Sequence, residues 1–509
     1  MGSVFATKEA CVFVGGNGNK AGVAMAGGCT RAWLESKGMN PVSLFGTNGS
    51  CKYQASDLEI STSGVINGSV GQFSGIEPGM AANITSGAGN GMFEVTAVGS
   101  QGQSITFGGW NFMESDTTTI YIGGAFNGLY QAMYYAYASS YDCYILSNKD
   151  ETITANMDLR FTGGNPQRNT WKRIIGYNQN LYLRDSRIVS DMDAGEVYSL
   201  SAEQIMQNGI SSGYKVNING AGFSGIAVSW KVDNLEMRHF RIIGNAGGSC
   251  LQPASGTALQ YKGLILKGCV FEGGTNGLYS NGLADFVYCE DCYAASSITG
   301  WGFYVLDSSG SGRSVAYNDC IANGCGSAFA TSGGSLIDGC MGRNNIVGMM
   351  TNSEIQVRNS LLYNCTGSAF ECNSSLARWH IWNTIAVMSN TAQYGIFRVQ
   401  ANGGNIVYED YNCFVKQDGT AAVYHYSGNW PTLYSPSLIG KHTIQKDPCF
   451  MDAANMDFRL RPNSPCLNAG RPTLCSGITS IGVQQKMQIP PRNVMYLNNR
   501  QYGEGNRVY

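Results

Sequence analysis

The stretch Cys320–Met350, CIANGCGSAFATSGGSLIDGCMGRNNIVGMM, decides the fold of this chain because it carries nearly the same pattern twice. The segment CIANGCGSAF is followed twenty residues later by CMGRNNIVGM, with cysteine, glycine and asparagine at comparable places. Internal repeats of this length predict a solenoid or a propeller, in which each unit packs against its sequence neighbours.

The repeat extends to both sides of this stretch. Each unit has a small residue that is followed by an apolar residue and preceded by Gly, Asp or Asn, which are types that tolerate a positive φ. Apolar residues five and three places earlier, such as Leu264 and Leu266, alternate as they do in a strand. We therefore expect a tight turn stacked coil upon coil. We call these small residues the small column. They are spaced by 23, 28, 20, 20 and 24 positions and are Cys269, Cys292, Cys320, Cys340, Ser360 and Thr384.

The repeat length selects among the repetitive folds. Coils of 20 to 28 residues are too short for a propeller blade of roughly 40, and they are poor in helix formers. A second, looser column, in which glycine precedes apolar residues, predicts another short strand in each coil; it includes Gly277, Gly302, Gly348 and Gly395. The pattern favours an all-β chain built around a parallel β-helix.

A parallel β-helix has two open ends that must be covered. Upstream of the coils, apolar and aromatic residues recur at helical spacing, at Phe126, Leu129, Tyr130, Met133 and Tyr134. This spacing predicts a short amphipathic helix near residues 126–137 that lies over the first coil.

Two further segments carry a resemblance to a known family. These are ITANMDLRFTGGNPQRNTWKRIIGYN, residues 153–178, and the exit DPCFMDAANMDFRLRPNSPCLNAG, residues 447–470. Together with the stacked Asn and Gly turns, they make residues 118 to 485 resemble right-handed parallel β-helix proteins of the pectate-lyase type. The resemblance implies a right-handed coil that the exit segment closes. The fold also occurs in bacteriophage tail spikes, fibres and capsid decoration proteins, as well as in polysaccharide lyases and glycoside hydrolases.

The chain is expected to divide into three parts. Residues 1–115 alternate apolar and polar positions between Gly-rich turns, for example at Phe93, Val95 and Ala97, which predicts a small β module of hairpins. The β-helix is expected to occupy residues 116–485. Residues 486–509 are polar and contain Pro490-Pro491, so we expect an extended C-terminal arm.

Composition narrows the possible partners and compartments. The net charge of −2 gives no reason to expect nucleic acid or an anionic membrane as a partner. The first thirty residues lack a basic start followed by an apolar run, so we expect no signal peptide and synthesis in the host cytoplasm.

The seventeen cysteines of a chain made in that compartment are expected to be mostly reduced. Neighbouring coils lie about 4.8 Å apart, which would permit disulfides, but Ser360 and Thr384 fill the same column.

No metal or cofactor is expected. The four histidines, His239, His380, His425 and His442, stand far apart in the sequence. Cys289-x-x-Cys292 has no second pair at zinc spacing, and its positions already fit the repeat.

Two sets of residues could carry a function on such a scaffold. Asp291 and Asp319 occupy equivalent turn positions in successive coils, about 5 Å apart, near the separation of the two carboxylates in a retaining glycosidase. Their alternative role is that of solvated turn residues. Four aromatic residues could form a sugar-stacking strip, with core or inter-subunit packing as the alternative: Tyr279, Trp301, Phe303 and Tyr304.

Two functions from different classes remain open. The first is a non-enzymatic bacteriophage virion protein, a tail spike, fibre or capsid decoration protein. Residues 1–115 would contact other virion proteins, the chain would form a homotrimer, and the coils could bind a host surface polysaccharide. The second is a polysaccharide-degrading lyase or glycoside hydrolase on the same scaffold.

Overall fold

The structure is a computed structural model of the whole chain. It describes residues 9–14, 29–30, 53–76, 78, 81–84, 91–108, 116–122, 129, 142–147, 150–155, 157–160, 171–176, 202–208, 216–231, 234–253, 261–281, 284–295, 300–306, 314–399, 405–422, 425–427, 440–471, 481, 494–497 and 500–503.

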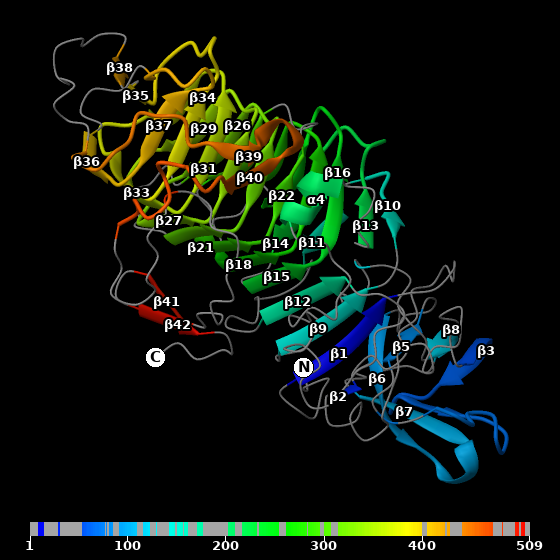
Figure 1. Ribbon diagram of the computed structural model, residues 1–509. Coiled ribbons are helices and arrows are strands. Elements are labelled where there is room, and N and C mark those ends of the chain that lie inside the picture. Colours follow the sequence, from blue (N-terminus) through cyan, green and yellow to red (C-terminus); the bar gives the residue numbers. More distant parts are fainter. Residues whose placement is uncertain are drawn as a thin grey trace.

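Three long sheets run side by side and form a parallel β-solenoid (Figure 1). The first sheet contains, in spatial order, β2 (Cys29–Thr30), β1 (Glu9–Val14), β9 (Asp142–Ser147), β12 (Trp171–Gly176), β15 (Asn234–Arg238), β18 (Tyr261–Lys267), β21 (Ala284–Glu290), β24 (Ser314–Asn318), β27 (Ser335–Asp338), β30 (Glu354–Arg358), β33 (Arg378–Trp382) and β36 (Asn405–Asp410). Every strand of this sheet from β1 onward pairs in parallel with the strand one coil away.

The other two sheets have ten strands each. The second sheet contains β10 (Glu151–Thr152), β13 (Val216–Asn219), β16 (Phe240–Gly244), β19 (Val270–Gly273), β22 (Tyr293–Ala294), β25 (Ile321–Asn323), β28 (Met341–Arg343), β31 (Leu361–Cys365), β34 (Ile385–Met388) and β37 (Cys413–Lys416). The third contains β11 (Met157–Arg160), β14 (Val228–Lys231), β17 (Ser249–Pro253), β20 (Asn276–Asn281), β23 (Trp301–Leu306), β26 (Ser327–Thr331), β29 (Val347–Thr351), β32 (Ser368–Cys372), β35 (Phe397–Val399) and β38 (His425–Ser427). The expected all-β fold with a parallel β-solenoid is therefore confirmed.

The register of the second sheet matches the repeat in the sequence. The residues that follow the small column pair with one another from coil to coil: Val270, Tyr293, Ile321, Met341, Leu361 and Ile385. The residues that precede the column all have a positive φ between 50° and 66°: Gly268, Asp291, Asp319, Gly339, Asn359 and Asn383. The predicted stacked turn is confirmed, and the reason is steric, because Gly, Asn and Asp adopt this backbone conformation most readily.

The column of turn residues with positive φ, which precedes the small column, is longer than the sequence suggested. His239 and Tyr411 occupy the next positions at its two ends, with φ of 60° and 57°. Phe240 and Asn412 correspondingly extend the small column, and both are fully buried. Because His and Tyr are not typical of turns with positive φ, the pattern of Gly, Asn and Asp in the sequence did not indicate these two turns.

Stacked side chains fill the interior of the coils. The rings of Phe303 and Phe329 are parallel, with centroids 5.2 Å apart, and Phe370 stacks on Phe397 at the same distance. Phe303, Phe329, Phe370 and Trp379 are fully buried. Because equivalent residues repeat every coil, each buried ring packs on the ring or aliphatic side chain of the next coil.

The outer face of the second sheet is covered by two segments. Helix α4 (Ala202–Asn208) packs against it through Ile205 and Met206. The exit segment, which we define as residues 440–471, contains β39 (Phe450–Asp452), a short 3-10 turn (Ala453–Asn455) and β40 (Asp457–Leu460) and crosses the same face (Figure 1). Phe458 contacts Tyr363 of β31, with ring centroids 5.1 Å apart. The exit segment therefore runs along the side of the coils.

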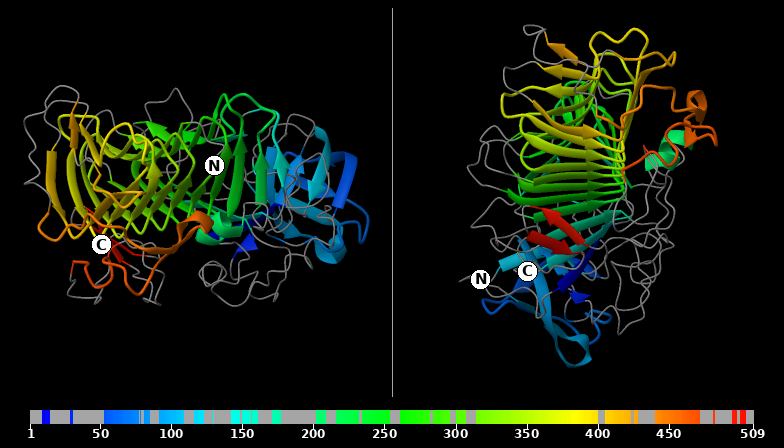
Figure 2. Two further views of the ribbon diagram at one scale, coloured as in Figure 1. Left: turned by 45° about the horizontal axis from the view of Figure 1, so that its top comes forward. Right: turned by 60° about the vertical axis from the view of Figure 1, so that its left-hand side comes forward.

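A separate β-barrel lies beyond the first coils (Figure 2). It is closed and antiparallel, with strands in the order β3 (Tyr53–Ile60), β4 (Val65–Asn67), β7 (Ser104–Gly108), β6 (Gly91–Val98), β5 (Ala81–Ile84) and β8 (Asp116–Ile122), and a 3-10 turn at Ser100–Gly102. Its core includes Ile60, Phe73, Val95, Phe107 and Ile120.

The barrel does not coincide with residues 1–115. Its last strand, β8, extends to Ile122 and pairs with β3 along its length. Strand β1 belongs to the solenoid, because it pairs in parallel with β9. The barrel is thus inserted between the first strand of the chain and the first coil.

The predicted ends of the solenoid are described only in part. The predicted helix near residues 126–137 lies outside the described residues except for Leu129, which is helical and fully buried, and whose backbone N–H donates to Glu151 Oε1 at 2.6 Å. In the expected C-terminal arm, β41 (Val494–Leu497) and β42 (Arg500–Gly503) form an antiparallel hairpin.

Candidate functional site

Asp291 and Asp319 lie in stacked turns of successive coils, as expected. The Asp291 side chain has a structural role, because its Oδ1 accepts a hydrogen bond of 2.8 Å from the backbone N–H of Ala202, the first residue of α4. Orphan N–H groups at helix starts are often satisfied by aspartate in this way. The geometry supports capping as the role of Asp291.

The aromatic candidates divide into two kinds. Phe303 is fully buried inside the coils and stacks on Phe329, so the expectation that it is an exposed sugar-stacking residue is wrong. Tyr304, the next residue in β23, and Trp301, the first residue of the strand, instead pack together against Ala330 and Met350, away from the interior of the coils. There Tyr279 stacks on Tyr304 with centroids 4.7 Å apart, and Trp301 lies 5.1 Å from Tyr304. Three half-buried rings therefore form one outward cluster.

The column thiols are buried. All twelve cysteines whose side chains the structure describes are free thiols, and eleven of them are buried. Burial raises the pKa of Cys250, Cys325 and Cys365 to about 12, although backbone hydrogen bonds oppose it at the first two. Such thiols stay protonated and react slowly, so they serve as small apolar side chains.

Among the residues that the structure describes, no group of three or more His, Cys, Asp or Glu side chains is arranged to hold a metal ion. No helix in those described parts is long and apolar enough to cross a membrane.

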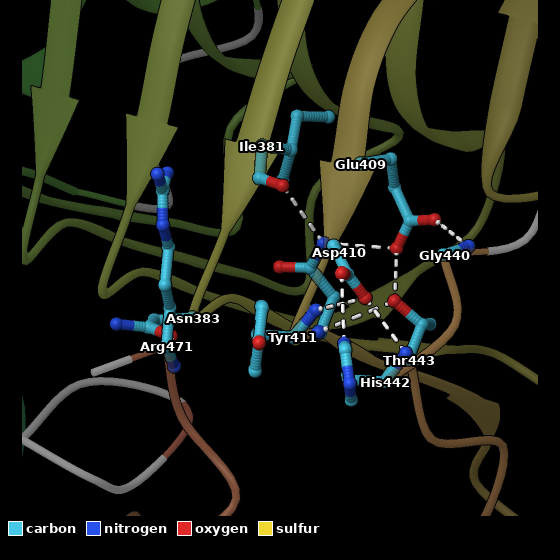
Figure 3. A network of polar contacts seen from close by, with 10 residues as sticks. Ile381, Asn383, Glu409, Asp410, Tyr411, Gly440, His442, Thr443 and Arg471 are labelled. Carbon is cyan, nitrogen blue, oxygen red and sulfur yellow. Dashed lines mark hydrogen bonds and ion pairs between the residues drawn. The ribbon is translucent and has the colours of Figure 1, made fainter.

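A polar and aromatic cluster at the last coils was not predicted. We call it the exit patch and define it as Trp382, Tyr408, Asp410, Tyr411, His442 and Arg471. Figure 3 labels Asp410, Tyr411, His442 and Arg471. The first four members of the exit patch come from the ends of β33 and β36 and the following turn, and the other two come from the exit segment. The exit patch therefore exists only where the exit segment meets the last coils.

One half of the exit patch is an imidazole held by a carboxylate. Asp410 Oδ2 lies 2.9 Å from His442 Nδ1, while Asp410 Oδ1 accepts from the backbone N–H groups of His442 and Tyr411 at 2.7 and 3.0 Å. The His442 ring stacks on Tyr411, with centroids 4.4 Å apart. The His442 side chain is 46% exposed, and its Nε2 has no partner among the described residues. A ring nitrogen fixed in this way can donate to or accept from a ligand.

The ionisation of Asp410 suits this arrangement. Partial burial acts to raise the pKa of Asp410, but hydrogen bonds from the His442 ring and from the His442 and Tyr411 backbones outweigh burial and lower it. The carboxylate therefore stays ionised and orients the imidazole.

The other half of the exit patch is an arginine on an aromatic shelf. The guanidinium carbon of Arg471 lies 5.5 Å from the centre of the Trp382 ring and 5.2 Å from that of Tyr408. The backbone N–H of Arg471 donates to Asn383 Oδ1 at 2.6 Å, which fixes where the side chain begins. Arg471 is exposed, and its guanidinium forms no ion pair within the described parts of the chain. The Trp382 and Tyr408 rings hold the Arg471 guanidinium in place but do not neutralise its charge.

A buried carboxylate supports the exit patch from inside. Glu409 pairs with Ile381, so it points into the last coil, and it is 7% exposed. It accepts hydrogen bonds from the Gly440 backbone at 2.7 Å, from the Asn412 amide at 2.9 Å and from the Thr443 hydroxyl. Glu409 therefore fastens the start of the exit segment to the end of the solenoid (Figure 3).

Sequence reasoning missed the exit patch because its members are far apart along the chain. The resemblance marks residues 447–470 as a segment that closes the coil, but His442 and Arg471 lie just outside these bounds. The sequence does not indicate which coils the exit segment contacts.

No family model matches the chain, and no curated protein matches it.

Proposed function

We propose that the chain is a non-enzymatic structural protein of a bacteriophage particle, a tail spike, fibre or capsid decoration protein that contacts glycans through its coils. The observation that carries the proposal is the division of the molecule into a long solenoid and a closed barrel at its first end. A rigid rod with an attachment module at one end suits a projecting virion component. The barrel would contact other virion proteins, and the resemblance to phage spikes points to a homotrimer.

The glycan contact would use outward aromatic rings. Tyr279, Trp301 and Tyr304 offer half-buried ring faces on β20 and β23, and such rings combine an apolar face with a polar edge. In this proposal Asp291 and Asp319 serve the stacked turns, and Asp291 also caps α4.

The proposal is tested by removing the barrel alone. Residues 53–122 are replaced by a short Gly-Ser linker, so that β1 can still cover β9. We expect the variant to keep the β-rich circular dichroism of the solenoid and to lose incorporation into particles when it competes with the full chain. A mass measurement of the full chain at micromolar concentration should give three copies. Incorporation without the barrel, or a monomeric full chain, would contradict the proposal.

The second candidate is a polysaccharide-degrading enzyme. One observation favours it: His442 is oriented by Asp410 and presents Nε2 outward, as a general base would. A lyase would release oligosaccharides with an unsaturated end, which absorb ultraviolet light. Loss of that product in His442→Gln would establish the enzyme and displace the structural proposal.

A further inference from the structure

We infer that the exit patch binds the carboxylate of an acidic sugar residue, and that the guanidinium of Arg471 makes the contact with this carboxylate. The inference deepens the proposed function, since it rests on the idea that the coils contact glycans. It assigns a chemical class to the ligand and places the contact at the last coils, apart from the rings of β20 and β23.

The charge of the exit patch points to an anion. Asp410, the only carboxylate in the exit patch, has both oxygens engaged, by His442 and by the Tyr411 backbone. Arg471 has no ion pair among the described residues, and its guanidinium lies over two rings. What faces a ligand is therefore the planar fork of Arg471 and the Nε2 edge of His442. A guanidinium fork matches the two oxygens of a carboxylate, and binding is stronger when the fork is held in place beforehand.

The neighbouring side chains point to a sugar. Trp382, Tyr408 and Tyr411 are half-buried, so each combines ring surface with solvent-facing edges. Sugar rings present apolar C–H faces and many hydroxyls, and they match surfaces that combine aromatic rings with side-chain donors and acceptors. An acidic peptide needs only the cation, whereas an acidic sugar also uses the rings and the imidazole.

The rigid support explains why the exit patch can be selective. Asn383 is 1% exposed, and it receives the Arg471 backbone N–H while its own N–H donates to the Tyr411 carbonyl at 3.0 Å. The two halves of the exit patch are therefore joined through one buried asparagine, and Figure 3 shows Tyr411 between Arg471 and His442. Sites held by such backing residues lose little conformational entropy on binding.

The inference is tested by calorimetric titration of the full-length protein. The probes are oligosaccharides of glucuronate, galacturonate and sialate, each beside its carboxyl-reduced neutral form, with a sulfated glucan and an acidic peptide of equal charge as comparators. We expect one or more of the acidic sugars to bind. Arg471→Gln should weaken that binding by about tenfold or more, the usual effect of losing a charge-assisted hydrogen bond. Arg471→Lys should recover only part of it, because lysine lacks the fork.

Lys446→Gln is the matched control, since it removes an exposed positive charge from the same segment outside the exit patch and should leave affinity unchanged. Equal weakening by Lys446→Gln, equal binding of neutral, sulfated or peptide probes, or no binding of any acidic sugar would overturn the inference. Arg471→Gln should still enter particles. Failure of the glycan assay with normal incorporation would thus refute the inference alone, and failure of incorporation by the full chain would refute the proposed function.

Discussion

The barrel and the solenoid solve the same problem of strand edges in opposite ways. The barrel closes on itself, with β3 paired to both β4 and β8, so its strands are hydrogen-bonded on both sides in a ring of antiparallel neighbours. The solenoid stacks coils and therefore has two ends, where β1, β2 and the exit segment add backbone partners. A closed barrel is stable only when all its strands are paired, whereas the stability of a stack of coils is approximately the sum of the contacts between neighbouring coils.

The sharpest test of this difference uses one phenylalanine from each region. Phe329→Ala leaves a cavity in the aromatic stack and should lower the free energy of unfolding of the solenoid by about 3–5 kcal/mol. Phe107→Ala should do the same to the barrel, where Phe107 is buried beside Phe93. Urea unfolding followed by hydrogen exchange in each region should show two independent losses. A loss that appears in both regions from either change would mean that barrel and solenoid fold as one unit.

The end of the stack is expected to depend on Glu409. Glu409→Ala would leave the buried Asn412 amide and the partly buried Gly440 N–H without this acceptor, at a cost of about 1–3 kcal/mol. The loss should be local, so hydrogen exchange should speed up in residues 440–446 and stay slow in β27 and β30. Unchanged protection of residues 440–446 would show that the exit segment is held by its apolar contacts alone.

A smaller effect is expected where α4 meets the second sheet. Asp291→Ala removes the acceptor for the Ala202 N–H and should cost about 1 kcal/mol. Asp291→Asn keeps both an acceptor and a side chain that tolerates φ of 53°, so it should be nearly neutral. Thermal unfolding of the two variants measures the difference. Equal destabilisation by both changes would show that the charge of Asp291, and not its acceptor atom, supports the helix.

The smallest expected effect is a pH dependence at the exit patch. The pKa of Asp410 is lowered in the folded chain, so its contribution is fully present above its unfolded value of about 3.9 and is lost as the pH falls through the folded value. Because the site is partly solvated, the contribution should be under about 1 kcal/mol. The hydrogen-exchange protection factor of Thr443, which is the intrinsic exchange rate at each pH divided by the observed rate, should fall on acidification in the wild type. Asp410→Asn should remove this dependence, and a dependence that persists would assign it to another group.

The sequence predicted the solenoid because a turn with positive φ admits few residue types. Gly, Asn or Asp precedes the small residue in successive coils from Gly268 to Asn383, and this made the repeat visible in the sequence. The barrel left only local alternation, since its pairing of β3 with β8 joins residues more than fifty positions apart. Its last strand and its place between β1 and β9 were consequently not foreseen.

The candidate site was less predictable than the fold. Alternation along β23 could have separated the buried Phe303 from its neighbour Tyr304, because successive side chains of a strand point to opposite faces. Alternation would have placed Trp301 on the same face as Phe303, so the outward position of Trp301 could not have been predicted in this way. The exit patch could not have been foreseen in this way. Residues 382 to 411 follow the repeat, but His442 and Arg471 reach the last coils only through the path of the exit segment.

A virion component must be found in the particle itself. The most direct measurement is mass spectrometry of bacteriophage particles purified from the host culture, combined with electron microscopy of the same particles. We predict that the chain is present at a fixed copy number, with the solenoid projecting from the particle surface and the barrel at its base. Particles that lack the chain would contradict the proposal.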